Sequence, residues 1–162
     1  MLEEAVKRLK GEDVSPFFRT PVFFKTNFFI PDEYIVDKRQ KIGFYKRFES
    51  CETLIEIDEL EKEMKDRFGA PPEGVLVLIE HEKIRTLASQ LRIDEILEES
   101  KAIKVKIGEQ SKIDRAKLVS FLEHDNRLQI DLKDPSILVF KSTEKSSNKK
   151  LGELKEWLTQ IS

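Results

Sequence analysis

The most constraining feature of this sequence is the helix stop Gly69-Ala70-Pro71-Pro72, because it separates two long apolar patterns. Glycine lets a helix terminate, and proline cannot continue one. The residues before the stop share one face and predict a helix over 53–68: Ile57, Leu60, Met64 and Phe68. The residues after it are apolar nearly all round over 75–79, which predicts a buried helix from Glu73 to about Leu91.

The chain before this stop contains signals for two further helices and one strand. Asp37 followed by Gln40 resembles a capping box and predicts a helix that ends near Ser50. Residues 22–26 alternate as a half-buried strand does, between two prolines. The first eleven residues place four apolar side chains on one helical face: Leu2, Ala5, Val6 and Leu9.

The periodicity changes to that of strands after about residue 100. Residues 103–107 and 128–132 alternate, and 137–140 form a continuous apolar run, which predicts three strands. One helix is expected between the first two strands, and a last helix carries Leu151, Leu154, Trp157, Leu158 and Ile161. Residues 142–150 are of low complexity and predict a linker.

These elements predict an α+β fold in a single compact domain that covers residues 1–162. Its N-terminal half is helix-rich with one strand, and its C-terminal half has about three strands and two helices. Within it we expect a connecting helix over 1–11, a helix-rich lobe over 12–100 and a strand-containing lobe over 101–162.

Composition indicates a cytoplasmic protein with no strong overall electrostatic field. Lys and Arg number 29 against 31 Asp and Glu, so the net charge is −2 and any charged partner must be met locally. The single cysteine, Cys51, excludes an internal disulfide and fits a reducing compartment. No apolar run approaches the roughly 20 residues that span a bilayer, so no membrane contact is expected.

The chain lacks the residue patterns that catalysis and metal binding require. The segment HEKIR begins like a zinc motif, but Arg85 stands where the second histidine should be. His81 and His124 are the only histidines, and the six glycines form no phosphate-binding loop. We therefore expect no catalytic residue, no metal and no cofactor in this chain.

Nucleic-acid binding is an alternative that the sequence leaves open. Residues 17–29 interleave phenylalanines with basic residues, as stacking platforms do, and residues 142–150 form a basic loop. The opposing interpretation is that the alternating phenylalanines face a core and the loop is solvated.

The end of the 53–68 helix carries more charge than a helix stop needs. With about 100° per residue, Glu63, Asp66 and Arg67 lie along one shoulder of the apolar stripe. One interpretation is purely local, since Glu63 and Arg67 form an i,i+4 pair worth about 0.2–0.5 kcal/mol. The other is an interaction site, in which the carboxylates face a partner's arginines and Arg67 faces a carboxylate or ring.

Three segments, in this order and spacing, resemble the C-terminal domain of bacterial transcription-repair coupling factors, the Mfd family: 1–11, 28–50 and 60–93. The most specific motifs are IP-x-x-YI with Pro31 and Tyr34, the FYKR of 44–47, and the block that runs from Glu63 through Phe68 and Gly69 to Pro72. Two features depart from the family pattern. Lys41 stands where the family more usually has arginine, and the segment 17–29 is unusually rich in phenylalanine.

The resemblance implies a non-catalytic regulatory domain in transcription-coupled nucleotide excision repair. Such a domain packs on the UvrB-like module of the same protein and masks the surface that recruits UvrA, an autoinhibition that involves Glu63, Asp66 and Arg67. UvrA, RNA polymerase and DNA would be met only through the full-length factor, whose motor domains use ATP and magnesium. The isolated domain is expected to be a monomer.

This chain alone should hydrolyse no ATP, because it has no phosphate loop and no cluster of metal ligands. The measurement is ATP turnover by a homogeneous preparation. Turnover that disappears on a point change within this chain would contradict the prediction.

Overall fold

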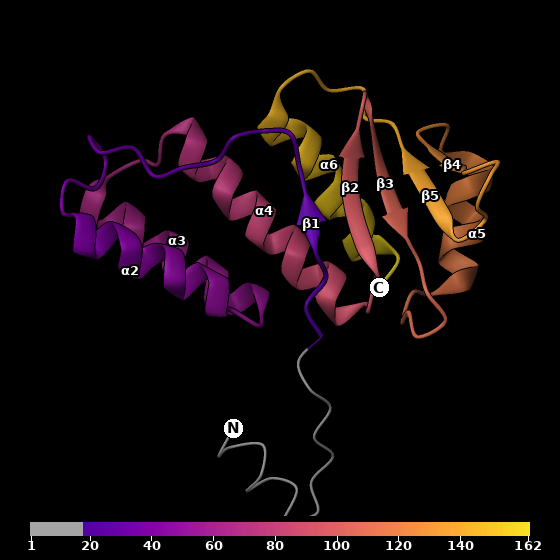
Figure 1. Cartoon of the computed structure of the whole chain (residues 1–162), viewed down its shortest axis with the longest axis horizontal. Coiled ribbons are helices and arrows are strands. Elements are labelled where there is room, and N and C mark those ends of the chain that lie inside the picture. The colour runs from indigo at the N-terminus through magenta and orange to yellow at the C-terminus, as the bar shows by residue number, and fades with distance from the viewer. Residues whose placement is uncertain (1–17) are drawn as a thin grey trace, which may run out of the picture.

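Helix α4 (Glu73–Gln90) runs through the middle of the protein, and the other elements are arranged around it (Figure 1). The computed structural model describes residues 18–162. The connecting helix expected over 1–11 lies outside the described residues, as does Phe17. The described part is a single compact domain of mixed helices and sheet, which confirms the predicted α+β class.

Helices α2 (Lys38–Ser50) and α3 (Leu54–Phe68) lie beside one end of α4 (Figure 1). Each helix begins at an N-cap residue whose side chain accepts backbone N–H groups of the first turn. Asp37 accepts those of Arg39 and Gln40 in α2, and Thr53 accepts that of Glu56 in α3. The predicted helices over 53–68 and up to Ser50 are therefore confirmed, and α4 confirms the one from Glu73.

The sheet has the strand order β1-β2-β3-β5-β4. Its strands are β1 (Val22–Phe23), β2 (Glu95–Glu99), β3 (Ala102–Lys106), β4 (Leu128–Ile130) and β5 (Ile137–Phe140). β1 is parallel to β2, and all other pairs are antiparallel. Helices α4 and α6 (Ser147–Gln160) cover one face, and α5 (Arg115–His124) lies beside β4 (Figure 1). No helix between residues 18 and 162 is both long and apolar enough to cross a membrane.

Strand β2 is an element that the sequence did not predict. It reads EILEE, and glutamate is depleted in strands. Its two buried positions are Ile96 and Glu98. A half-buried strand is recognised by apolar residues at alternate positions, and Glu98 stands where the second apolar residue would be. Glu98 is buried because it forms an ion pair with Lys150 of α6.

Two other boundaries differ from the prediction. The strand expected over 22–26 ends at Phe23, because the N–H of Lys25 donates to the Glu98 carboxylate (2.9 Å) instead of continuing the ladder. The linker expected over 142–150 ends at Ser146, where α6 begins. The division of the chain into two lobes at residue 100 stays a prediction. The sheet includes strands from both sides of that residue, β1 and β2 before it and β3, β4 and β5 after it.

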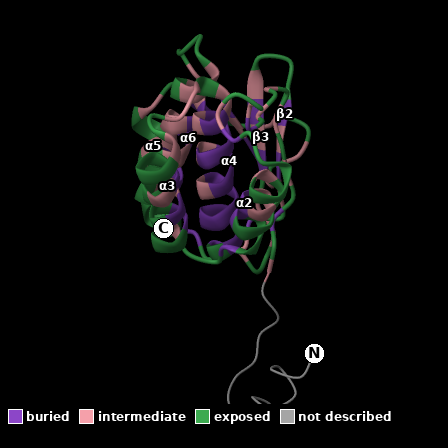
Figure 2. Ribbon diagram, turned by 90° about the vertical axis from the view of Figure 1, so that its left-hand side faces the viewer, coloured by how far each residue is buried: buried purple, intermediate pink, exposed green. Residues whose placement is uncertain are grey.

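Helix α4 belongs to both hydrophobic clusters of the described residues. Val75, Leu78 and Ile79 of α4 pack with α2 and α3, whereas Ile84 and Leu87 pack with the sheet and α6. Figure 2 shows α4 as the most continuously buried helix of the protein. Its burial on several sides explains why its sequence is apolar nearly all round.

Gly74 near the start of α4 provides a test of this packing. A Cβ added there would lie 2.8 Å from the carbonyl oxygen of Phe29, closer than real contacts allow. Gly74→Ala should therefore destabilise the protein by about 1–3 kcal/mol. Gly152→Ala in α6 is the matched control, since its Cβ meets nothing within 4 Å, and helix propensity should stabilise it by up to about 1 kcal/mol. Denaturant titration measures both, and equal stability of the two variants would disprove the close contact.

Candidate protein-interaction surface

The end of α3 is fixed by contacts between the two motifs that the sequence singled out. Gly69 has a φ of 83°, which favours glycine, and its N–H donates to the carbonyl of Lys65 in the last turn of the helix. The hydroxyl of Tyr34 donates to the carbonyl of Gly69 (2.9 Å), and its ring lies 5.8 Å from that of Phe68. The carbonyl of Pro31 accepts the N–H of Tyr34 (3.1 Å). Pro72 occupies the N-cap position of α4.

Phe68 is less buried than its helical spacing predicted. The other three stripe residues are at most 5% exposed, namely Ile57, Leu60 and Met64. Phe68 is only half-buried, because it lies in the last turn and packs at the edge of the cluster with Phe44 and Tyr34. It therefore faces the same cluster as the other three, but at its margin.

Glu63 is the centre of a charge network that includes an arginine from another helix. Arg47 of α2 donates to both carboxylate oxygens of Glu63, from Nη1 (2.5 Å) and from Nη2 (3.1 Å). Nη1 of Arg67 lies 3.5 Å from the same carboxylate, so the predicted i,i+4 pair is present. The hydrogen bond from Arg47 holds the pKa of Glu63 below its usual value. Sequence reasoning missed Arg47, although it belongs to the FYKR motif.

Both arginines of this network lie over aromatic rings. The guanidinium carbon of Arg47 is 5.2 Å from the ring centre of Phe44, and that of Arg67 is 5.6 Å from the same ring and 5.1 Å from that of Phe68. Phe44 and Phe68 contact each other edge to face. Cation–π attraction of about 0.5–1 kcal/mol at an exposed site favours these positions. The arginine side chains are nevertheless about half exposed, so they remain available to a partner.

Asp66 differs from Glu63 in having no internal partner. It is exposed, and its side chain forms no hydrogen bond or ion pair with another residue of the described part. It lies one turn after Glu63 on the same helix and next to Arg67. The structure therefore brings Glu63 and Arg67 together and leaves the Asp66 carboxylate to solvent.

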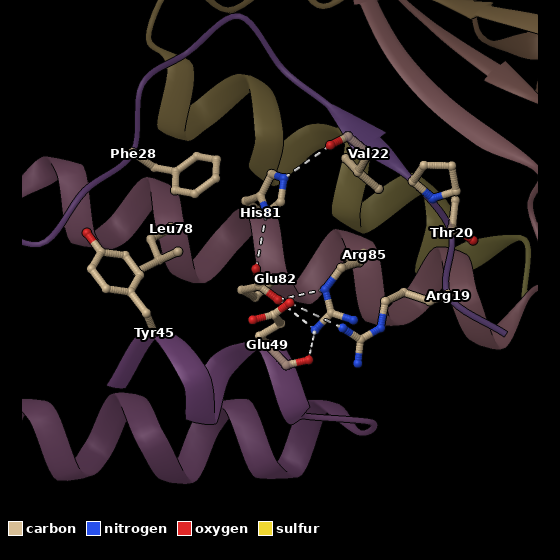
Figure 3. Close-up of a pocket in the computed structure, with 11 residues that line it drawn as sticks. Arg19, Thr20, Val22, Phe28, Tyr45, Glu49, Leu78, His81, Glu82 and Arg85 are labelled. Carbon is tan, nitrogen blue, oxygen red and sulfur yellow. Dashed lines mark hydrogen bonds and ion pairs between the residues drawn. The ribbon is translucent and has the colours of Figure 1, made fainter. Parts of the chain in front are cut away.

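The HEKIR segment lies in a pocket of about 450 Å³ between α2, α4 and residues 19–28 (Figure 3). Nη2 of Arg85 is 2.6 Å from the Glu82 carboxylate. The same nitrogen donates to the carbonyls of Phe48 (3.2 Å), Cys51 (3.4 Å) and Glu49 (3.5 Å). These carbonyls belong to the last turn of α2 and its C-cap residue Cys51, and that of Phe48 also accepts the N–H of Cys51. Arg85 thus caps α2.

His81 and Glu82 complete this buried cluster. His81 packs against the rings of Phe24 and Phe28, and its Nε2 lies 3.4 Å from the carbonyl of Val22 (Figure 3). Burial alone would raise the pKa of Glu82, but the adjacent His81 ring and the charge of Arg85 outweigh it and lower that pKa. The stabilising contribution of Glu82 is therefore complete above its unfolded value of 4.5 and is lost as the pH falls through the lowered value.

These polar residues join neighbouring elements of the fold. The two arginines of the pocket are paired, Arg85 with Glu82 and Arg19 with Glu49. Burial raises the pKa of the Cys51 thiol to about 11, so the thiol is protonated at neutral pH. Among residues 18–162, no group of three or more His, Cys, Asp or Glu is placed to hold a metal ion.

The two segments of the nucleic-acid alternative meet where the hydroxyl of Thr26 donates to that of Ser147 (3.1 Å), and only some of their basic and aromatic side chains are exposed. Lys145 and Lys149 are exposed, but Lys150 is paired with Glu98. Of the phenylalanines in 18–29, Phe24 and Phe28 pack against the core, whereas Phe23 and Phe29 are about half exposed.

Comparison with known proteins gives matches that agree with one another on a single family. A family model described as the TRCF domain matches residues 24–118. The transcription-repair-coupling factor of Bacillus subtilis (strain 168) is 37% identical over 73% of this chain and 10% of its own length. That of Escherichia coli (strain K12) is 30% identical over 76% of this chain and 11% of its length. The chain thus spans about a tenth of the length of these curated relatives.

A solved structure shares the fold. It is a crystal structure of the C-terminal domain of a transcription-repair coupling factor, and it matches with a TM-score of 0.74 at 22% sequence identity. The match covers 89% of this chain and 94% of that one.

The Arg85 cap predicts a large cost for its removal. Arg85→Ala should destabilise the protein by about 3–5 kcal/mol, because the buried Glu82 carboxylate loses its guanidinium partner and the carbonyls of Glu49 and Cys51 lose their side-chain donor. Arg85→Lys should recover only part of this loss, since lysine cannot reproduce the planar fork. Arg39→Ala on the exposed face of α2 is the control and should change stability by less than about 0.5 kcal/mol. Thermal and denaturant unfolding measure all three, and equal effects of Arg85→Ala and Arg39→Ala would contradict the capping role.

Proposed function

The chain belongs to the TRCF domain family, and from this membership we propose that it is a non-catalytic regulatory domain of a transcription-repair coupling factor. In the proposal it packs on the UvrB-like module of the same protein and masks the surface that recruits UvrA. The masking is relieved when the full-length factor engages stalled RNA polymerase on DNA. ATP and magnesium are used by other domains of that factor.

The observation that carries the proposal is the exposed charge at the end of α3. Asp66 has no partner among the described residues, and Arg47 and Arg67 are about half exposed while held over aromatic rings. Fixed, solvent-accessible charges of both signs suit recognition of a complementary protein surface. The helix end below them is rigid, because Tyr34 and Phe68 anchor it.

A polar surface of this kind suits a contact that must open. The matched residues make up only about a tenth of the length of the curated relatives, so the domain would be tethered to its partner. A tether raises the effective concentration to about the millimolar range, and a modest interface then holds the closed state. Interfaces between domains of one chain are typically more polar than obligate ones.

Alanine variants in the full-length factor test the proposal. Glu63→Ala, Asp66→Ala and Arg67→Ala should each expose UvrA binding without RNA polymerase, since loss of one desolvated charge at an interface costs about 2–5 kcal/mol. The melting temperatures of Asp66→Ala and Arg67→Ala should stay near that of the parent, because exposed positions usually change stability by less than about 0.5 kcal/mol. Glu63→Ala should melt somewhat earlier, because it also loses the bidentate bond that joins α3 to Arg47 of α2. The measurement is UvrA binding and thermal melting of the same samples.

Two controls make the result interpretable. Phe68→Ala should lower the melting temperature most, although by less than the roughly 3–5 kcal/mol of a fully buried phenylalanine, because its ring is half-buried. Lys62→Ala, an exposed position on the same helix, should change neither readout. If the three charge variants melt as early as Phe68→Ala while UvrA binding stays masked, the motif only fastens the domain internally and the proposal is wrong.

A further inference from the structure

Helix α5 and the end of the sheet beside it leave part of the hydrophobic core uncovered. α5 carries four large apolar side chains, and none of them is buried: Leu118, Val119, Phe121 and Leu122. Ile130 of β4 pairs with the buried Leu138 of β5, so its side chain lies on the core-facing side of the sheet, yet it is 47% exposed. Val119 is 52% exposed. The helix therefore covers this end of the sheet incompletely.

The uncovered surface is an apolar groove of about 270 Å³ between α5 and strands β4 and β5. Apart from two serines and Arg115, every described side chain that lines it is apolar. Leu132, two residues after Ile130, is fully exposed as well. Pockets for drug-sized ligands usually measure about 300–1,000 Å³ and carry several convergent polar groups. This groove instead suits the apolar side chains of a docked protein segment.

Hydrogen bonds hold the walls of this groove in place. The N–H of Ile107 donates to the carbonyl of Ser136 (2.8 Å), and the hydroxyl of Ser136 donates to the Asp134 carboxylate (2.6 Å). The start of α5 is fixed to the C-terminal end of the chain, because the N–H of Asp114 donates to the carbonyl of Ile161 (2.8 Å). A preformed groove loses little conformational freedom when a partner binds.

Arg115 is the one charged side chain among the described residues that line the groove. It is exposed, and its side chain forms no hydrogen bond or ion pair with another residue of the described part. It is also the first residue of α5, where the helix dipole disfavours a cation, so helix stability does not explain it. The acids nearby are engaged, since Asp114 accepts the N–H of Lys117 and Asp134 accepts two bonds from Ser136. The free charge of the groove is therefore a donor for an acid.

We propose that this groove is a second docking surface, and that its occupant is an amphipathic helix of a partner protein. The helix places its apolar residues in the groove and a carboxylate against Arg115, in a charge-assisted pair that fixes its register. A nucleic acid would need several cations along the groove, which has one among its described lining residues. The groove and α3 lie at opposite ends of the protein (Figure 1), so this inference is independent of the proposed function.

A helix suits the groove better than an added strand does, although β4 is an edge strand of the sheet. The carbonyl of Arg127 and the N–H of Asp131, on either side of β4, bond to the chain around β5. Alternate residues face opposite ways, so the outward-facing backbone groups of β4 are those of Leu128 and Ile130. The N–H of Leu128 already donates to the carbonyl of Asp125 (3.2 Å). A partner strand would find too few free groups, whereas a helix needs only the apolar groove.

The test measures binding of two synthetic stapled helices to the chain 1–162. The acidic probe has Leu at i, i+3, i+4 and i+7 and a Glu one turn beyond each end of this stripe, and the basic probe has Lys at both ends instead. The acidic probe should bind at least about tenfold more tightly than the basic one. Arg115→Gln should reduce this preference to less than about threefold. Arg39→Gln, at an exposed arginine of α2, is the matched control and should leave the preference unchanged.

A second pair of variants tests the apolar contact. Val119→Gln should weaken both probes at least about fivefold, because it places a polar group where apolar surface is buried. Ile55→Gln, at a position of α3 that is 70% exposed, is the matched control and should not change binding. In NMR spectra, the acidic probe should shift the amide signals of α5 and of residues 128–138. Both substituted positions are exposed, and thermal melting checks that the fold is intact.

Four other results would overturn the inference. Equal binding of the two probes, or a preference that Arg115→Gln leaves intact, would show that no carboxylate meets Arg115. Signal shifts confined to other parts of the chain would show that the groove is not the binding site. Dimers of the unliganded chain that dissociate on Val119→Gln in analytical ultracentrifugation would make the occupant a second copy. A rise in probe affinity on deletion of residues 1–17 would make the occupant a segment of this chain.

Discussion

Helix α4 is buried along most of its length, and this burial determines where the other elements lie. A helix that is apolar on every side needs neighbours on every side. α2 and α3 cover its first half, and the sheet with α6 covers its second half (Figure 1). The turn at 69–72 joins α3 to the start of α4. The charged end of α3 is consequently attached to the most continuously buried helix of the protein.

The polar side chains of α4 give this packing its specificity. Burial of a polar group costs free energy unless the group finds a partner, and those on α4 supply partners that other segments lack. The guanidinium group of Arg85 donates hydrogen bonds to the carbonyls of Phe48 and Cys51 at the end of α2. The hydroxyl of Ser89 accepts the N–H of Thr20, and the hydroxyl of Thr20 donates to the carbonyl of Ile93. α4 thereby places both α2 and the chain that leads into β1.

The elements that the sequence predicted correctly are those specified by nearby residues. Asp37 caps its own helix, and Gly69 ends α3, so a few letters suffice. β2 was not predictable in this way, because the compensation for its inward-facing Glu98 is Lys150, on the last helix. The same holds for the candidate site. Glu63 and Arg67 are one turn apart, whereas Arg47 reaches Glu63 only because α2 packs against α3.

The charges of the candidate surface do not depend on pH near neutrality. The hydrogen bond from Arg47 lowers the pKa of Glu63, so this carboxylate stays ionised well below neutral pH. Neither histidine of the chain lies on α2 or α3. If the contact proposed for this surface forms, it opens by competition or by a change in its tether rather than by a pH change near neutrality. If the tether supplies a millimolar effective concentration, a competitor present at micromolar levels has to bind roughly a thousandfold more tightly. A rearrangement that moves the tether removes that advantage at once, so it opens the contact more effectively than competition does.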